Sequence, residues 1–234
     1  MLKALPHIIT LSNLFCGCCA LLAVFHQQYV AVFFFLLIAG LADYGDGLVA
    51  RWLDVKSELG KELDSLADMV SFGLVPGTIL YELLKHGYSL SFQDEIIAAA
   101  LPAFLITLSS ALRLAKYNLD TRQTESFIGL NTPSCTMFVV GLMLIYHFDS
   151  YGLGSWVVQP VFLYFVILCL SYLLVAEIPM FSFKFKNFNW TGNEVRFIFL
   201  GLSLVLLPIL QEVTFSLMVI LYVLFSLYLR IKKG

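Results

Sequence analysis

Four aspartates lie at the facing ends of two neighbouring apolar segments of this chain. Asp43 and Asp46 are three residues apart, and Asp64 and Asp68 are four apart, so each pair projects from one face of a helix. Carboxylates brought this close repel one another unless a cation neutralises them. Hard divalent cations such as Mg²⁺ and Mn²⁺ prefer carboxylate and phosphate oxygens. The pattern therefore predicts a pair of metal ions that hold a diphosphate.

The residues after the first pair favour a phosphate ligand. Gly47 and Ala50 continue the helical face of Asp43 and Asp46 with little or no side chain, which leaves a groove where a ligand can approach the backbone. Arg51 follows as a fixed cation that can grip a phosphate with two hydrogen bonds. Two metal ions in this place can activate a leaving phosphate and steady the attacking oxygen. The expected chemistry is therefore transfer at phosphorus.

Three other interpretations of the acidic residues stay open. The first is a solvated loop with incidental acids, against which the paired spacing, the small residues and Arg51 all count. The second is a cation-transport site, since transporters also place carboxylates in the membrane. Transport sites favour the middle of the bilayer, whereas these acids lie at a boundary. The third is a purely structural membrane protein.

The composition predicts an all-α polytopic membrane protein. The 234 residues are 60% hydrophobic and only 13% charged, with a mean hydropathy of +0.88, whereas soluble domains are about 25% charged. No basic aromatic patch indicates nucleic acid as a partner. Apolar stretches of about 20 residues can cross a bilayer as helices. We predict about eight of them, at residues 6–26, 29–50, 62–84, 95–115, 131–148, 157–177, 195–210 and 214–230.

The basic residues predict the orientation of these segments. With the N-terminus inside, thirteen of the fourteen Lys and Arg residues fall on the inner side, and only Lys85 falls outside. Inner loops of membrane proteins carry this excess of positive charge. Both termini and the four aspartates are therefore expected on the cytoplasmic side. If the last two segments instead formed a hairpin lying in the membrane–water interface, the number of Lys and Arg residues on the inner side would be unchanged.

The spacing of the acidic stretch resembles a known family signature. The pattern Asp-x2-Asp-Gly-x2-Ala-Arg-x8-Gly-x3-Asp-x3-Asp is met in full between Asp43 and Asp68, with Gly60 as the second glycine. It resembles that of the CDP-alcohol phosphotransferases. The family usually has Asn at His7, Arg-Phe at positions 116–117 and Pro at Asn131. Four further stretches resemble the phosphatidylserine synthase branch, at residues 5–10 with 13–17, 63–73, 112–118 and 127–133.

This resemblance implies a fold, a reaction and a location. The fold is one integral membrane domain, 1–234, with a six-helix catalytic core at 1–178 and an additional helix pair at 195–231. The reaction is CDP-diacylglycerol plus L-serine giving phosphatidylserine plus CMP, with glycerol phosphate, inositol phosphate or choline as alternative acceptors. The implied location is the inner (cytoplasmic) membrane, among membrane lipids, with the active site at the cytoplasmic face. The implied assembly is a homodimer.

The resemblance also implies roles for single residues. Asp43, Asp46 and Asp64 would bind Mg²⁺ or Mn²⁺, two ions in all, and Asp68 would be both a ligand and the general base. The implied CDP-diacylglycerol contacts are Pro6, Thr10, Gly47, Ala50, Arg51, Ser57 and Gly60. Ser57 has the alternative of an ordinary loop hydroxyl, and Pro6 that of simply starting the first helix.

A serine acceptor brings its own carboxylate, which cations at the inner face can hold. The candidates are Asn13, Arg113, Lys116, Asn118 and Arg122. The alternative for the three cations is that they only set the topology. Glu177 precedes Ile178 and Pro179, and we expect it only to end the sixth segment.

Overall fold

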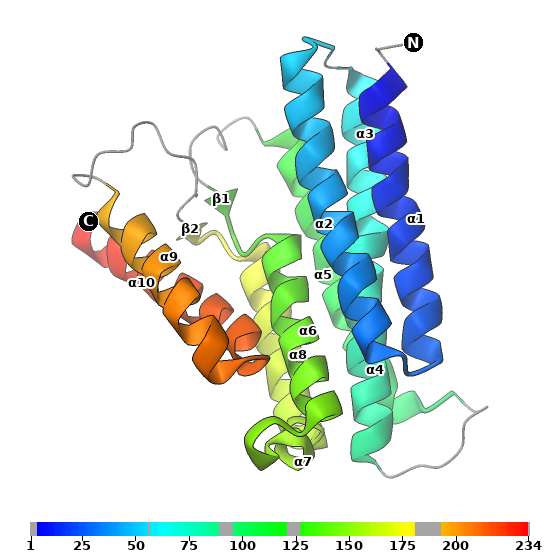
Figure 1. The fold of residues 1–234 in the computed structure, drawn as a ribbon, viewed down its shortest axis with the longest axis vertical. Helices are drawn as coiled ribbons and strands as arrows, with labels where there is room; N and C mark the ends of the chain where they lie inside the picture. Colours follow the sequence, from blue (N-terminus) through cyan, green and yellow to red (C-terminus); the bar gives the residue numbers. More distant parts are fainter. Residues whose placement is uncertain (1–3, 56, 89–95, 121–126, 181–192, 234) are drawn as a thin grey trace.

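The computed structural model describes residues 4–55, 57–88, 96–120, 127–180 and 193–233. These residues form a bundle of helices that lie side by side (Figure 1). The principal helices are α1 (Leu5–Phe25), α2 (Tyr29–Trp52), α3 (Glu58–Asp68), α4 (Val75–Gly87), α5 (Leu105–Leu119), α6 (Thr132–Phe148), α8 (Pro160–Val175), α9 (Glu194–Leu210) and α10 (Val213–Lys233). Shorter elements are η2 (Met69–Leu74), η3 (Ala98–Phe104), η4 (Ser150–Gly152), α7 (Gly154–Val157), β1 (Phe127–Ile128) and β2 (Pro179–Met180).

The helices confirm the prediction of an all-α polytopic membrane protein. Within the described ranges, five helical stretches are long and apolar enough to cross a membrane, namely 5–25, 29–52, 58–87, 98–119 and 213–231. Two shorter apolar helices, α6 and α8, cover two further predicted segments. The 17-residue α9 covers the remaining one. The division into a core at 1–178 and a pair at 195–231 stays a prediction.

A single long helical stretch carries two of the four aspartates. It runs from Glu58 to Gly87 as α3, η2 and α4. The middle piece, η2, is a π-helical turn that begins directly after Asp68. Such wide turns interrupt α-helices mostly at functional sites. Hydroxyl groups tie η2 to α1, α5 and α6, through Ser71 donating to the Asn13 carbonyl (3.1 Å), Thr107 to the Gly73 carbonyl (3.0 Å) and Thr136 to the Phe72 carbonyl (3.1 Å).

Small residues bring neighbouring helices into close contact with one another. A β-carbon at Gly17 of α1 would collide with the Ser71 hydroxyl of η2. A β-carbon at Gly141 of α6 would likewise collide with Ser216 of α10. The Ser216 hydroxyl donates to the Phe138 carbonyl at 2.9 Å. Close approach at small residues is typical of helices that pack inside membranes. The C-terminal pair, which runs obliquely in Figure 1, is therefore packed on the bundle through α10.

Candidate functional site

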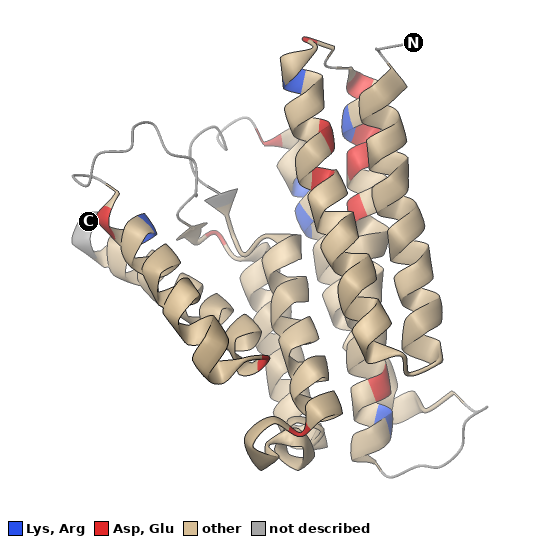
Figure 2. Cartoon of the chain, viewed as in Figure 1, with Lys and Arg blue, Asp and Glu red and all other residues tan. Residues whose placement is uncertain are grey.

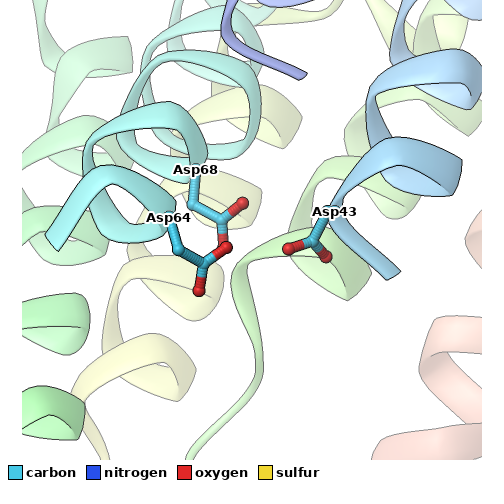
Figure 3. A group of neighbouring side chains, drawn as sticks. All are labelled: Asp43, Asp64 and Asp68. Carbon is cyan, nitrogen blue, oxygen red and sulfur yellow. The ribbon is translucent and has the colours of Figure 1, made fainter. Parts of the chain in front are cut away.

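Charged residues gather at one end of the bundle, where α2 ends and α3 begins (Figure 2). Asp43 comes from α2, and Asp64 and Asp68 come from one face of α3 (Figure 3). One carboxylate oxygen from each of these three residues lies within 4.8 Å of the other two. All three side chains are only partly exposed. Two helices thus bring three acids together beside the π turn.

The three carboxylates fit a divalent cation. Two unit charges about 4 Å apart repel by about 4 kcal/mol at the effective dielectric constant of a protein surface. Oδ1 of Asp64 is buried and has no hydrogen-bond partner among the described residues. A hard cation supplies the charge that this arrangement lacks, because carboxylate oxygens are its preferred ligands. We define Asp43, Asp64 and Asp68 as the acidic trio.

Asp46, the fourth aspartate, lies outside the acidic trio. Its side chain is 7% exposed and accepts a hydrogen bond from the Thr10 hydroxyl of α1. The same hydroxyl lies 3.0 Å from the carbonyl oxygen of Pro6, one turn earlier. The structure therefore places one of the predicted lipid contacts, Thr10, against Asp46, while Pro6 contacts Thr10 through its carbonyl oxygen. One consequence is that Thr10 orients this carboxylate.

Asn13 is the polar partner of Asp68. Its Nδ2 donates to Oδ1 of Asp68 at 3.2 Å, and its side chain is fully buried. Because an amide nitrogen can only donate, this contact favours a carboxylate oxygen that accepts. Sequence reasoning placed Asn13 among the serine contacts and missed this role. The missing information was the side-by-side position of α1 and α3, which no local pattern encodes.

The predicted phosphate-binding side of α2 is open. A β-carbon at Gly47 would meet only the Arg51 guanidinium, at 4.0 Å. Arg51 is exposed, and Ala50 beside it is half-buried. An exposed guanidinium next to a small residue can reach a ligand that approaches the backbone. The phosphate contacts of these three residues stay a prediction.

Ser57 and Gly60 shape the start of α3. The Ser57 hydroxyl accepts a hydrogen bond from the Gly60 backbone N–H at 3.0 Å, so it caps the helix. A β-carbon at Gly60 would lie 3.1 Å from the His7 ring. Gly60 therefore allows α1 to approach α3 closely, and Ser57 has a structural role in addition to any ligand contact.

A cavity lies at the end of α5, and we call it the α5 cavity. It includes two of the predicted serine contacts, Arg113 and Lys116. Sequence reasoning missed its two acids, Asp120 and Glu177, because no motif joins residues so far apart in the chain. The lining residues are Arg113, Lys116, Tyr117, Asp120, Ile128, Leu174, Val175, Ala176 and Glu177.

The other predicted serine contacts lie elsewhere. The Asn118 side chain donates to the Ser65 hydroxyl of α3 at 2.8 Å. The backbone carbonyl oxygen of Asn118 accepts from the Lys61 ammonium group at 2.7 Å. Asn118 therefore links α5 to α3 and does not line the α5 cavity. Arg122 lies outside the described residues.

An apolar groove opens beside the acidic trio, between α2, η2, α6 and α10. Gly40 and Leu41 belong to it and precede Asp43 by less than one helical turn. Its walls are almost entirely apolar. The lining residues are Phe33, Leu36, Leu37, Gly40, Leu41, Phe72, Pro133, Thr136, Met137, Val140 and Phe215.

Comparisons with known proteins agree on one family. The family model described as CDP-alcohol phosphatidyltransferase matches residues 3–170. A relative from Bacillus subtilis (strain 168) is 31% identical over 180 residues, which cover 77% of this chain and 91% of the relative. One from Helicobacter pylori (strain ATCC 700392 / 26695) is 31% identical over 205 residues, 86% of this chain and 81% of the relative. Both relatives bear the name CDP-diacylglycerol–serine O-phosphatidyltransferase.

Proposed function

The chain belongs to the CDP-alcohol phosphatidyltransferase family, and on that premise we propose that it transfers the phosphatidyl group of CDP-diacylglycerol to L-serine. The products are phosphatidylserine and CMP. The observation that carries this proposal is the acidic trio, in which two helices bring three carboxylate oxygens within 4.8 Å of one another. The names of the two relatives support serine as the acceptor.

The four aspartates would hold the metal ions that this chemistry needs. Asp43, Asp64 and Asp68, with Asp46 beside them, would bind two ions of Mg²⁺ or Mn²⁺. When bound, such ions neutralise a diphosphate and stabilise charge on its oxygens. Arg51 donates to the phosphate oxygens from the open side of α2. The lipid's nucleotide then lies along Gly47 and Ala50, near the start of α3 and the residues Pro6, Thr10, Ser57 and Gly60.

Asp68 acts as the general base. A serine hydroxyl is a weak nucleophile, so a carboxylate must accept its proton as it attacks phosphorus. The new bond joins the serine oxygen to the lipid-side phosphorus. The bond from that phosphorus to the bridging oxygen breaks, and CMP leaves with the electron pair. Asn13 holds one oxygen of Asp68, which keeps the carboxylate oriented toward the acceptor.

The choice of acceptor is tested by supplying alcohols one at a time. The purified protein in lipid nanodiscs receives CDP-diacylglycerol, Mg²⁺ or Mn²⁺, and serine, glycerol phosphate, inositol phosphate or choline. We expect CMP and phosphatidylserine with serine only. Turnover with another alcohol and none with serine would overturn the acceptor while keeping the family reaction. Metal flux without CMP release would instead favour a transporter.

We also propose a topology and an assembly. The active site and both termini lie on the cytoplasmic side, as the distribution of Lys and Arg predicts. Tags at the two termini should then resist protease added outside intact bacterial cells. The homodimer that the family resemblance implies stays a prediction, and mass measurement of the protein in nanodiscs tests it.

The apolar groove beside Asp43 suits an acyl chain of the lipid substrate. It adjoins the acidic trio and is walled by apolar side chains, so a lipid could enter it without leaving the membrane. At Gly40 a β-carbon would make only an ordinary contact, 3.9 Å from the Phe72 ring, whereas larger side chains would fill the groove.

Gly40→Leu should therefore raise the KM for long-chain CDP-diacylglycerol about fivefold, equivalent to about 1 kcal/mol of binding. Gly40→Ala is the matched control and should behave as the wild type. Both substitutions favour the helix, so folding is preserved. Steady-state kinetics with long-chain and dihexanoyl CDP-diacylglycerol measure the effect. An equal rise for both lipids would remove the acyl chain from this groove.

A further inference from the structure

The α5 cavity carries charges of both signs. Arg113 and Lys116 supply the cations, and Glu177 and Asp120 supply carboxylates. Arg113 is only 7% exposed, and its Nε has no hydrogen-bond partner among the described residues. Burying a guanidinium group costs free energy when some of its N–H groups have no hydrogen-bond acceptor. A ligand that supplies acceptor oxygens is therefore favoured in this cavity. The carboxylate of Glu177 is exposed on the segment after α8.

Two hydrogen bonds place Arg113 at the level of Asp68. Thr107 of α5 donates to the Gly73 carbonyl at 3.0 Å, and Asn118 donates to Ser65 at 2.8 Å. The helices α3–η2 and α5 therefore run antiparallel and in contact between these two points. Arg113 lies near the middle of this stretch of α5, and Asp68 lies near the middle of the facing stretch. The α5 cavity is thus next to the proposed general base.

The backbone that carries Glu177 is held in place. The N–H of Gly129 donates to the Ile178 carbonyl at 2.8 Å, and that of Leu130 donates to the Leu173 carbonyl at 2.9 Å. Gly129 has φ of +77°, and a β-carbon there would lie 2.9 Å from the Ala176 carbonyl oxygen. Only glycine suits this position, because it combines a left-handed backbone with close approach to the backbone at the end of α8. These two hydrogen bonds therefore fix the segment on both sides of Glu177.

We propose that Glu177 receives the α-ammonium group of the acceptor amino acid while Arg113 binds its carboxylate. This inference rests on the proposed serine transfer, and it makes Glu177 a specificity-determining residue. The charge pattern matches an amino-acid zwitterion, whose ammonium and carboxylate groups are attached to the same carbon atom. A phosphate acceptor would be repelled by Glu177, and choline would leave Arg113 without an anion. The cavity therefore selects amino acids over the other alcohols.

The test compares acceptors that each lack one charge. L-Serine, 3-hydroxypropionate (no ammonium) and ethanolamine (no carboxylate) are supplied to the wild type, Glu177→Gln and Glu177→Asp. We expect Glu177→Gln to raise the KM for serine about fivefold. Its KM for CDP-diacylglycerol should not change, and its preference for serine over 3-hydroxypropionate should fall about fivefold. Glu177→Asp should retain most of that preference, and Glu62→Gln, an exposed acid of α3, should retain all of it.

The outcomes separate this inference from the proposed function. If the wild type uses serine and Glu177→Gln keeps the wild-type preference, the ammonium contact is wrong and the serine transfer stands. Absence of serine turnover in the wild type overturns both. If Glu177→Gln lowers the unfolding temperature, Glu177→Lys is tested in its place. If the inference holds, Glu177→Lys loses activity with serine and keeps activity with 3-hydroxypropionate. Loss of the two acceptors together by Glu177→Lys would count against it.

Discussion

We expect Asp68→Asn to lower CMP release from CDP-diacylglycerol and serine by about a thousandfold or more. The amide cannot accept the serine proton, and general bases contribute about 10²–10⁴-fold to such reactions. Loss of one negative charge from the acidic trio also weakens metal binding. Binding of the nucleotide lipid should be largely preserved, because the proposed contacts at Arg51 and the open face at Gly47 are untouched. Asn is nearly isosteric with Asp, and its carbonyl can still accept from Asn13.

This result is measured as CMP formed per minute at saturating serine, with binding of CDP-diacylglycerol followed separately. Glu62→Gln is the matched control, since it removes an exposed carboxylate from α3 without touching the acidic trio. It should keep the wild-type rate. An Asp68→Asn protein that turns over within tenfold of the wild type would show that another group accepts the proton. Lost binding together with lost turnover would show that Asp68 mainly holds the ions.

The helices could be predicted from sequence because the bilayer imposes a simple rule on them. Each segment must satisfy its own backbone hydrogen bonds over about 20 apolar residues, so local composition is sufficient. The spacing of Asp64 and Asp68 likewise fixes their common helical face. The π turn after Asp68 was not predictable in this way. Hydroxyl groups on other helices, such as Thr136, hold it, and their position depends on packing.

The candidate site was predictable only as far as its motif extends. The motif does not distinguish its four aspartates from one another. The structure does, because it groups Asp43 with Asp64 and Asp68 and pairs Asp46 with Thr10. That difference comes from the position of α1, which the motif does not include. The position of Glu177 in the lining of the α5 cavity could not be predicted from sequence either. Glu177 is 64 residues from Arg113, and the β1–β2 pair brings its segment to the end of α5.

Removal of divalent metal should abolish activity, and Mg²⁺ or Mn²⁺ should restore it. A divalent ion relieves the mutual repulsion of the three close carboxylates of the acidic trio. Ca²⁺ takes more ligands at longer distances, so it should restore less activity. The ligand set also predicts which substitution changes the metal requirement. Asp43 is the only member of the trio from α2, so Asp43→Asn would remove the only ligand that α2 contributes to an ion held by the trio.

We expect Asp43→Asn to raise the metal concentration for half-maximal rate at least about tenfold, equivalent to about 1.4 kcal/mol of lost binding. Titration of chelator-treated protein with MnCl₂, read as CMP release, measures it. Asp54→Asn is the control, because Asp54 is exposed in the loop after α2 with φ of +50°, a conformation that Asn also tolerates. Since the two substitutions remove equal charge, a shift shared by both would reflect surface charge alone. A shift confined to Asp43→Asn would mean that the ion is held between α2 and α3.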